Sequence, residues 1–218
     1  MQEIPSPVLV TDTRFWDGAA RKYAASPVSD PEGWERTLAR TAAWLAPEQQ
    51  VLELGCGTGS TALRLAPKVG HYVATDLSPT MIEIARERLA DAPRENLEFR
   101  TGTAETLAEA EPGRYDVVLG FNYLHLVEDP ARTLASVQRL LKPGGCFVSK
   151  TVCLKEMNPL IALAIPVLRA FGKAPAGVQR LDAAMLVQAL RSAGFELEAD
   201  ERHGSKGRDP RPFLVARR

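Results

Sequence analysis

The length, composition and charge of the chain describe an ordinary globular domain and exclude several classes of protein. Its 218 residues, of which 45% are hydrophobic and 25% charged, suffice for one domain that needs no disulfide bonds. Because 27 Lys and Arg face 27 Asp and Glu, there is no net positive field, and nucleic acid is not an expected partner.

The cysteines and the hydropathy pattern predict a cytoplasmic protein. The three cysteines are odd in number and lack the paired spacing of metal ligands, which indicates reduced thiols and no metal site. The first residues show no basic start followed by an apolar run, and no window reaches the roughly 18 apolar residues of a membrane span. We therefore expect neither a signal peptide nor a membrane span.

Apolar periodicity and turn residues predict alternating helices and strands in the first part of the chain. A leading amphipathic helix is expected over residues 33–45, ended by Pro47. The elements expected after it are strand 50–54, helix 59–66, strand 71–76, helix 78–91, strand 96–101 and strand 115–121. This rhythm is typical of the α/β class, with a mostly parallel sheet and helices on both faces.

The last part of the chain predicts a reversed strand. The expected elements are a helix that begins at Asp129 and is broken by residues 142–145, strand 146–152, a helix capped by Asp182 and ended by Gly194, and strands 195–199 and 212–216. Only about ten residues separate the last two strands, too few for a helical crossover, so these strands should pair antiparallel.

A glycine-rich turn follows the first predicted strand. Gly55, Gly57 and Gly59 leave backbone amides and a helix N-terminus facing a ligand. Asp76 ends the second strand, where a carboxylate can accept hydrogen bonds from both hydroxyls of an adenosine ribose. Residues 57–62 also satisfy the GxGxxA variant of the dinucleotide fingerprint, so glycine spacing alone leaves NAD binding open.

Four ordered motifs identify a family. The sequence contains VLELGCGTG, then ATDLSPTMIEIAR, then YDVVLGFNYLHLVEDP, then LLKPGG. Together they resemble the class I S-adenosylmethionine-dependent methyltransferases, in particular the small-molecule branch that includes ubiquinone and menaquinone biosynthesis enzymes. The resemblance implies a Rossmann-like fold of seven strands in the order 3-2-1-4-5-7-6 with the last strand antiparallel. It also implies S-adenosyl-L-methionine as cofactor and S-adenosyl-L-homocysteine as product.

The same resemblance implies cofactor contacts by motif position. Expected contacts are Glu53 with Gly55, Cys56, Gly57 and Gly59 for the methionine part, Asp76 for the ribose, Leu77 and Met81 beside adenine, Thr103 and Ala104 at its amino group, Phe121 or Asn122 on the methionine side, and Tyr23 in a segment that closes over the cofactor. Met81 also fits a core position at helical spacing, and Tyr23 also fits a packing aromatic.

The methyl acceptor should bind at the same edge of the sheet. His125 could take a proton as methyl transfer proceeds, and Tyr123 is the second candidate catalytic residue, although a structural role fits His125 as well. Arg208 and Arg211 could pair with a carboxylate or phosphate of the acceptor, or belong to a solvated loop.

An apolar segment, residues 157–171, is too short to span a bilayer. It predicts a lid over an apolar acceptor, a homodimer surface or a contact with a membrane surface. We divide the single domain 1–218 into a cofactor-closing segment (1–32), a cofactor-binding core (33–152), this lid insertion (153–181) and a C-terminal helix with the antiparallel strands (182–218).

The expected function is therefore methyl transfer from S-adenosylmethionine to a small, apolar or amphipathic organic acceptor. A nucleic-acid or protein methyltransferase is disfavoured by the neutral charge and by the absence of an NPPY pattern after the fourth strand. The glycine-rich turn is also compatible with an NAD-dependent oxidoreductase or with a non-catalytic nucleotide-binding module.

Overall fold

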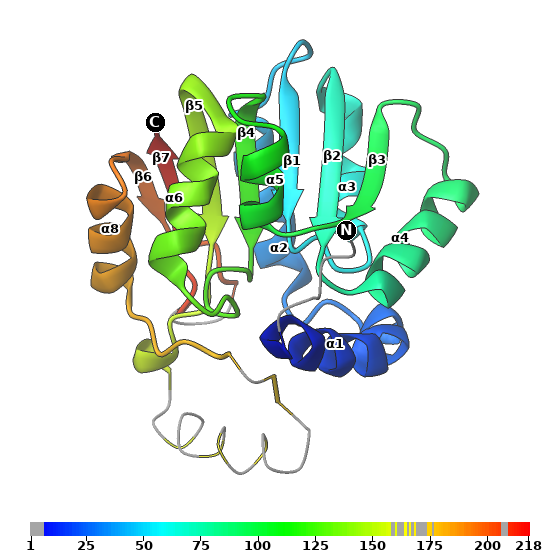
Figure 1. Ribbon diagram of the computed structural model, residues 1–218, viewed down its shortest axis with the longest axis horizontal. Coiled ribbons are helices and arrows are strands. Elements are labelled where there is room, and N and C mark those ends of the chain that lie inside the picture. The colour runs from blue at the N-terminus through cyan, green and yellow to red at the C-terminus, as the bar shows by residue number, and fades with distance from the viewer. Residues whose placement is uncertain are drawn as a thin grey trace.

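A computed structural model describes residues 7–157, 160, 164, 166, 168, 174–175, 177–205 and 209–218. Its centre is a seven-stranded sheet in the order β3-β2-β1-β4-β5-β7-β6, shown in Figure 1. The strands are β1 (Gln50–Leu54), β2 (His71–Asp76), β3 (Leu97–Thr101), β4 (Tyr115–Phe121), β5 (Leu141–Lys150), β6 (Glu196–Glu201) and β7 (Phe213–Arg217). Because β7 alone runs antiparallel to its neighbours β5 and β6, the predicted Rossmann-like order and the reversed last strand are confirmed.

Four of the described helices begin at a capping Asp or Ser side chain. Asp30, Ser78, Asp129 and Asp182 each accept a backbone N–H of the turn that follows, which satisfies donors that a helix leaves unpaired. The helices are α1 (Pro7–Ala25), α2 (Pro31–Ala42), α3 (Ser60–Leu65), α4 (Pro79–Asp91), α5 (Ala104–Ala110), α6 (Pro130–Leu140) and α8 (Ala183–Ser192), with short 3₁₀ turns η1 (Ala66–Lys68) and η2 (Leu154–Glu156).

Two hydrophobic cores lie on the two faces of the sheet. Helices α5, α6 and α8 cover the face that carries Leu52 and Phe147, and α2, α3 and α4 cover the face that carries Val51 and Val148. Neighbouring residues alternate between the two cores because side chains along a strand point to opposite faces.

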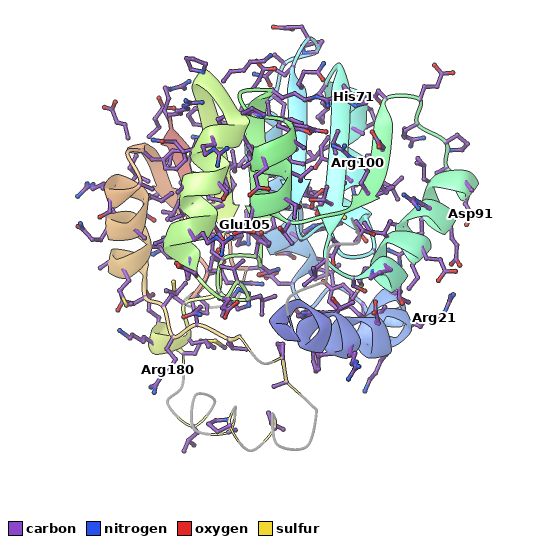
Figure 2. The ribbon with its side chains drawn as sticks, viewed as in Figure 1. Arg21, His71, Asp91, Arg100, Glu105 and Arg180 are labelled. Carbon is purple, nitrogen blue, oxygen red and sulfur yellow. The ribbon has the colours of Figure 1, made fainter. Side chains whose placement is uncertain are left out.

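Helix α1 closes the edge of the sheet where the parallel strands end. It lies below the carboxyl ends of the strands in Figure 1, and Ala20 packs against Met81 and Ile84 of α4. His71, at the amino end of β2, marks the opposite edge in Figure 2. Ligand sites of open parallel sheets lie at the carboxyl edge, so α1 covers the expected site.

The structure differs from the sequence prediction in four elements. Helices α1 and α5 were not predicted, although Thr103 and Thr106 form a capping box at the start of α5. The leading helix α2 begins at Pro31, two residues before the predicted start. Strand β5 begins at Leu141 and not at residue 146, because Leu141 already pairs with Tyr115 of β4; residues 142–145, where Gly144 has a φ of 77°, form an irregularity before Cys146 pairs with Val117.

Two sequence predictions fall mainly on parts outside the described residues. These are Arg208 and most of the apolar segment 157–171. Within the described part of the chain, no helix combines the length and apolar character that crossing a membrane requires.

Candidate functional site

A cavity of about 410 Å³ opens at the carboxyl edge of the sheet. This volume lies in the range of small-molecule sites. The glycine-rich turn, the segment from Tyr23 to Asp30 and helix α2 form its walls, and the ends of β4 and β5 contribute Phe121, Asn122 and Lys150. Seven of the predicted cofactor residues line it: Tyr23, Glu53, Gly55, Cys56, Gly57, Phe121 and Asn122.

The three glycines of the turn all have positive φ, at 66°, 54° and 79° for Gly55, Gly57 and Gly59. A Cβ atom at Gly59 would lie 2.6 Å from the ring of Phe99, so that glycine permits close packing of the turn. A Cβ at Gly57 would meet only Tyr23, at 3.7 Å, and would enter the cavity. The backbone at Gly57 is therefore open to a ligand.

Glu53 is buried at the end of β1 and is 2% exposed. The Tyr72 hydroxyl donates a 2.8 Å hydrogen bond to its carboxylate. Burial raises the pKa of Glu53 to about 8, the Tyr72 hydrogen bond opposes this rise, and the neighbouring charge of Asp76 adds to it. No Lys or Arg in the described chain forms an ion pair with this carboxylate, so it suits a cationic ligand.

Asp76 connects the glycine turn to helix α4. Its two carboxylate oxygens accept 2.9 Å hydrogen bonds from the backbone amides of Gly57 and Ser78. Burial raises the pKa of Asp76, while these hydrogen bonds lower it. Since a carboxylate has about four acceptor positions, Asp76 keeps acceptor capacity for a ligand.

Arg88 holds the cavity cover in place. Its guanidinium donates to the backbone oxygen of Thr58 at 3.1 Å, to the Ser60 hydroxyl at 3.0 Å and to the carbonyl of Ala24 at 2.9 Å. These bonds join the glycine turn to the end of α1, next to Tyr23. The predicted closing segment therefore lies over the turn.

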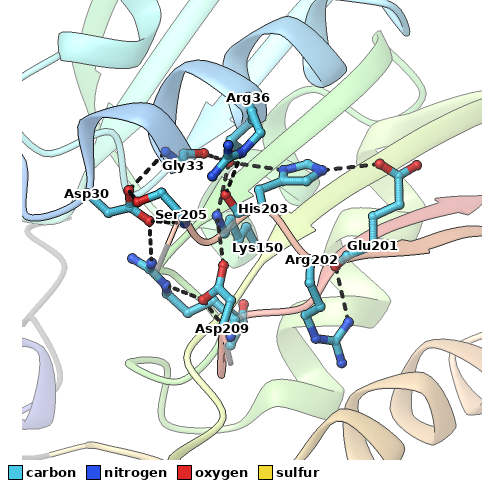
Figure 3. A network of polar contacts seen from close by, with 12 residues as sticks. Asp30, Gly33, Arg36, Lys150, Glu201, Arg202, His203, Ser205 and Asp209 are labelled. Atoms are coloured by element: carbon cyan, nitrogen blue, oxygen red, sulfur yellow. Dashed lines mark hydrogen bonds and ion pairs between the residues drawn. The ribbon is translucent and has the colours of Figure 1, made fainter. Parts of the chain in front are cut away.

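The opposite end of the cavity carries basic groups. Lys150, the last residue of β5, is 7% exposed, and its amine lies 3.0 Å from Thr37 Oγ1 and 3.3 Å from Asp209 Oδ2. Arg211 donates from Nε to Asp209 at 2.9 Å and lies 4.0 Å from Asp30. Figure 3 shows this network between α2, β5 and the segment before β7.

Asp30 holds the basic end together. Its side chain accepts 3.0 Å hydrogen bonds from the backbone amides of Gly33 and Ser205, and the Ser205 hydroxyl donates to it at 2.5 Å. The bonds from Ser205 are the largest cause that keeps the pKa of Asp30 well below its usual range. One carboxylate thus caps α2 and attaches a segment distant in sequence to it.

The two candidate catalytic residues lie outside the cavity lining. Burial lowers the pKa of His125 to about 4, so its ring is neutral at physiological pH, and its Nδ1 has no partner in the described chain. Tyr123 packs against Gly55 and Gly120, and burial raises the pKa of its hydroxyl. Their catalytic roles stay predictions.

The residues expected at adenine lie beside the cavity and do not line it. Met81 is 2% exposed and packs against Ala20, which fits its alternative role in the core. Thr103 caps α5 through the amide of Thr106, and the Ala104 backbone bonds to Tyr123. Leu77 lies between Asp76 and the start of α4. Thr103 Oγ1 and the Ala104 backbone thus already have hydrogen-bond partners within the chain.

Cys56 lines the turn as a small buried side chain. Burial raises the pKa of its thiol well above the ordinary value, which argues against a nucleophilic role. Cys146 and Cys153 are also buried, and all three thiols are free.

Sequence reasoning missed Lys150, Asp30 and Thr37. Of these three, only Lys150 could have been found from the sequence. It is a lysine that directly follows four uncharged, buried strand residues, Cys146-Phe147-Val148-Ser149. Such a position needs a partner or a function. Asp30 and Thr37 acquire their roles only when α2 meets His203 and Ser205, about 170 positions later.

Comparison with known proteins identifies relatives of this chain. A family model described as "Methyltransferase domain" matches residues 52–147. A demethylmenaquinone methyltransferase from Lactococcus lactis is 31% identical over 178 residues, which cover 71% of this chain and 68% of the relative. A demethylmenaquinone methyltransferase from Leptospira interrogans is 38% identical over 115 residues, covering 51% and 45% respectively.

Solved structures support the fold, while the coverage of curated relatives is uneven. The chain spans only 3% to 48% of the length of the first curated relatives that it matches. The solved structure of the [4+2]-cyclase SpnF has a TM-score of 0.76 and 20% identity, with 99% of this chain and 98% of that chain covered. At this identity the likeness concerns the fold alone, and the name of that protein describes a reaction other than methyl transfer.

Proposed function

Since the chain belongs to the class I S-adenosylmethionine-dependent methyltransferases, we propose that it methylates a small amphipathic organic molecule bound in the 410 Å³ cavity. One observation carries this proposal. The glycine-rich turn of the cofactor motif and the basic residues Lys150 and Arg211 line the same cavity. A donor bound at the turn and an acceptor bound at the basic end would thus share one enclosed space.

The residues at the turn fit S-adenosylmethionine. Glu53 and Asp76 are buried carboxylates with raised pKa values and no cationic partner in the described part of the protein. A ligand that carries a sulfonium and an ammonium would compensate the charge of Glu53, and its hydroxyls would donate hydrogen bonds to Asp76. When bound, S-adenosylmethionine supplies an electrophilic methyl group, and the departing sulfur keeps the electron pair of the broken bond.

Each side chain at the turn has a defined task in this proposal. The Gly57 backbone gives the ligand room, and Glu53 faces the positive charges of its methionine part. Asp76, which keeps acceptor capacity beside its bonds to Gly57 and Ser78, binds the ribose hydroxyls. Tyr23 and the end of α1 exclude water above the turn, as Arg88 fixes that cover.

The lining of the other half supports an amphipathic acceptor. Val28, Trp34, Leu38 and Phe121 give it apolar surface, and Thr37, Lys150 and Arg211 add polar groups. Methyl transfer needs the nucleophile near 3 Å from the methyl carbon, so both ligands must be held in one closed site. Arg211 would then pair with an anionic group of the acceptor, and Arg208 stays a second candidate for that role.

We also propose that the protein works in the cytoplasm. Its three free, buried thiols suit a reducing compartment. The apolar segment 157–171 stays a candidate lid, dimer surface or membrane contact.

Calorimetry tests the proposal directly. We expect S-adenosylhomocysteine to bind in the micromolar range and NAD not to bind. A screen of small acceptors, read by release of S-adenosylhomocysteine from S-adenosylmethionine, then identifies the substrate class. Binding of NAD without S-adenosylhomocysteine would favour an oxidoreductase, and S-adenosylhomocysteine binding without turnover of any acceptor would favour a non-catalytic module.

A further inference from the structure

Lys150 occupies an unusual place for a lysine. It is the cross-strand partner of Phe121, on the face of the sheet that also carries Val148 and Phe213. Its position on β5 is two strands away from Glu53 on β1, which at the usual strand spacing is about 10 Å. Strand β4 lies between these two positions and carries Phe121, which also lines the cavity.

The amine of Lys150 has an unused donor. Of its three N–H groups, one faces Thr37 Oγ1 at 3.0 Å and a second faces Asp209 Oδ2 at 3.3 Å. No third partner occurs in the described chain, and Lys150 lines the cavity. Burial lowers the pKa of Lys150, and the charge of Asp209 opposes that shift.

The two partners hold the amine in a fixed position. The Thr37 hydroxyl donates to the carbonyl of Gly33 at 2.8 Å and lies 3.1 Å from Nδ1 of His203. Asp209 is fixed by Arg211 through a 2.9 Å bond. Figure 3 shows these residues converging on Lys150 from α2 and from the segment before β7. A donor held this way needs little reorganisation when a ligand arrives.

Stability alone does not account for this arrangement. A buried ion pair commonly contributes no more than apolar side chains of the same volume would, because both charges lose their hydration. A lysine that is buried, anchored on two sides and still open to a cavity on its third suits recognition of an anion. An ammonium is a point charge that matches one oxygen, whereas carboxylates fit the fork of an arginine better.

We propose that Lys150 binds the ionised oxygen of a phenol- or enol-type methyl acceptor, with Phe121 beside the planar part of that acceptor. This inference rests on the proposed function and specifies its substrate class. Lys150 is then a substrate-binding residue that favours the ionised form of the acceptor, and an acceptor that enters ionised requires no separate base.

The test uses 4-nitrophenol as a probe, because its phenolate absorbs visible light and the neutral phenol does not. The probe is titrated into the full-length protein saturated with S-adenosylhomocysteine. The variants are Lys150→Met and the double variant Lys150→Met with Asp209→Asn, which removes both charges and leaves no unpaired carboxylate. Lys68→Met, an exposed lysine on η1, is the matched control.

We expect the wild type and Lys68→Met to bind the phenolate in preference to the phenol. Both Lys150 variants should bind it about 10- to 100-fold more weakly, the loss of one charge-assisted hydrogen bond, with unchanged S-adenosylhomocysteine affinity. Phenolate binding by the double variant at wild-type strength would overturn the inference and leave Lys150 with a structural role. Absence of any phenolate preference in the wild type would also overturn it, whereas failure to bind S-adenosylhomocysteine would contradict the proposed function instead.

Discussion

The two ends of the cavity are built in different ways. At the acidic end, Glu53, the glycine turn and Asp76 come from two adjacent strands within 24 residues of sequence. At the basic end, Asp30, Thr37, Lys150 and Asp209 come from α2, β5 and the segment before β7. Among the described residues, no Lys or Arg forms an ion pair with Glu53 or Asp76, whereas the charged groups of the basic end pair with one another.

This difference concerns what each end can bind. The carboxylates of the acidic end have no cationic partner and therefore favour a cationic ligand. Their pKa values are raised because burial without such a partner disfavours the ionised form. At the basic end, Lys150 and Arg211 both form ion pairs with Asp209. Their positive charges are therefore partly balanced, and a ligand would meet N–H donors that are held in fixed directions. We therefore expect changes at the acidic end to affect donor affinity strongly, and changes remote from both ends to affect it little.

The largest expected effect is that of Asp76→Ala. This change removes the acceptor that we propose for the ribose hydroxyls, and calorimetry should show an affinity for S-adenosylhomocysteine lower by about 100-fold or more. Asp116→Ala is the control, since Asp116 also accepts a backbone amide, that of Gln50, whereas only Asp76 accepts an amide of the glycine turn, that of Gly57. Equal losses in the two variants would show that Asp76 acts only through the fold.

The second prediction, of a smaller effect, distinguishes two consequences of a side chain at the glycine turn: loss of room for the ligand and strain in the backbone. Gly57 and Gly113 have similar φ values, 54° and 66°, and a Cβ at Gly113 meets nothing within 4 Å. Alanine at either position should lower the free energy of unfolding by about 1–2 kcal/mol, the cost of a left-handed residue. Only Gly57→Ala should also weaken S-adenosylhomocysteine binding, by roughly tenfold or more. If Gly57→Ala bound S-adenosylhomocysteine as tightly as the wild type, the turn would not be part of the binding site.

A third prediction concerns the pH dependence of stability. The pKa of Glu53 rises from the ordinary 4.5 to about 8, so between these values the folded protein keeps a proton that the unfolded chain releases. This group therefore lowers the free energy of unfolding as pH rises from 4.5 to about 8. Glu53→Gln keeps an acceptor for Tyr72 and should reduce that fall by roughly 1–4 kcal/mol in denaturant titrations. Identical pH profiles of stability for the wild type and Glu53→Gln would show that Glu53 in the folded protein is ionised over this whole pH range.

The smallest expected effect is that of His125→Asn on ligand binding. Because this neutral ring does not line the cavity, S-adenosylhomocysteine affinity should stay within about threefold of wild type while the melting temperature falls by a few degrees. A loss of methyl transfer without a loss of stability, measured once an acceptor is known, would instead support the catalytic role that the sequence suggests.

The acidic end could be predicted from sequence because its determinants are local. A strand, a glycine turn and an acid at the next strand tip specify the geometry almost without long-range contacts, and Gly57, Glu53 and Asp76 lie together as the motif implies. The antiparallel pairing of the last two strands was also readable, since a connection of about ten residues leaves no room for a crossover helix, whereas the strand order followed from the family resemblance.

The basic end could not be predicted because it depends on packing between distant segments. Asp30 reads locally as nothing more than a helix cap, and its bonds to Ser205 exist only after β7 has paired with β5. Helix α5 was missed for a different reason, since its capping box uses Thr106 where Glu or Gln is the usual residue.

A crystal structure of the protein with S-adenosylhomocysteine and 4-nitrophenol tests the division of the cavity most directly. We predict the homocysteine part beside Gly57 and Glu53, the ribose on Asp76, and the phenolate oxygen within hydrogen-bond distance of Lys150 Nζ. A complex in which S-adenosylhomocysteine lies against Lys150 and Arg211, or in which the phenolate binds away from this cavity, would contradict the account.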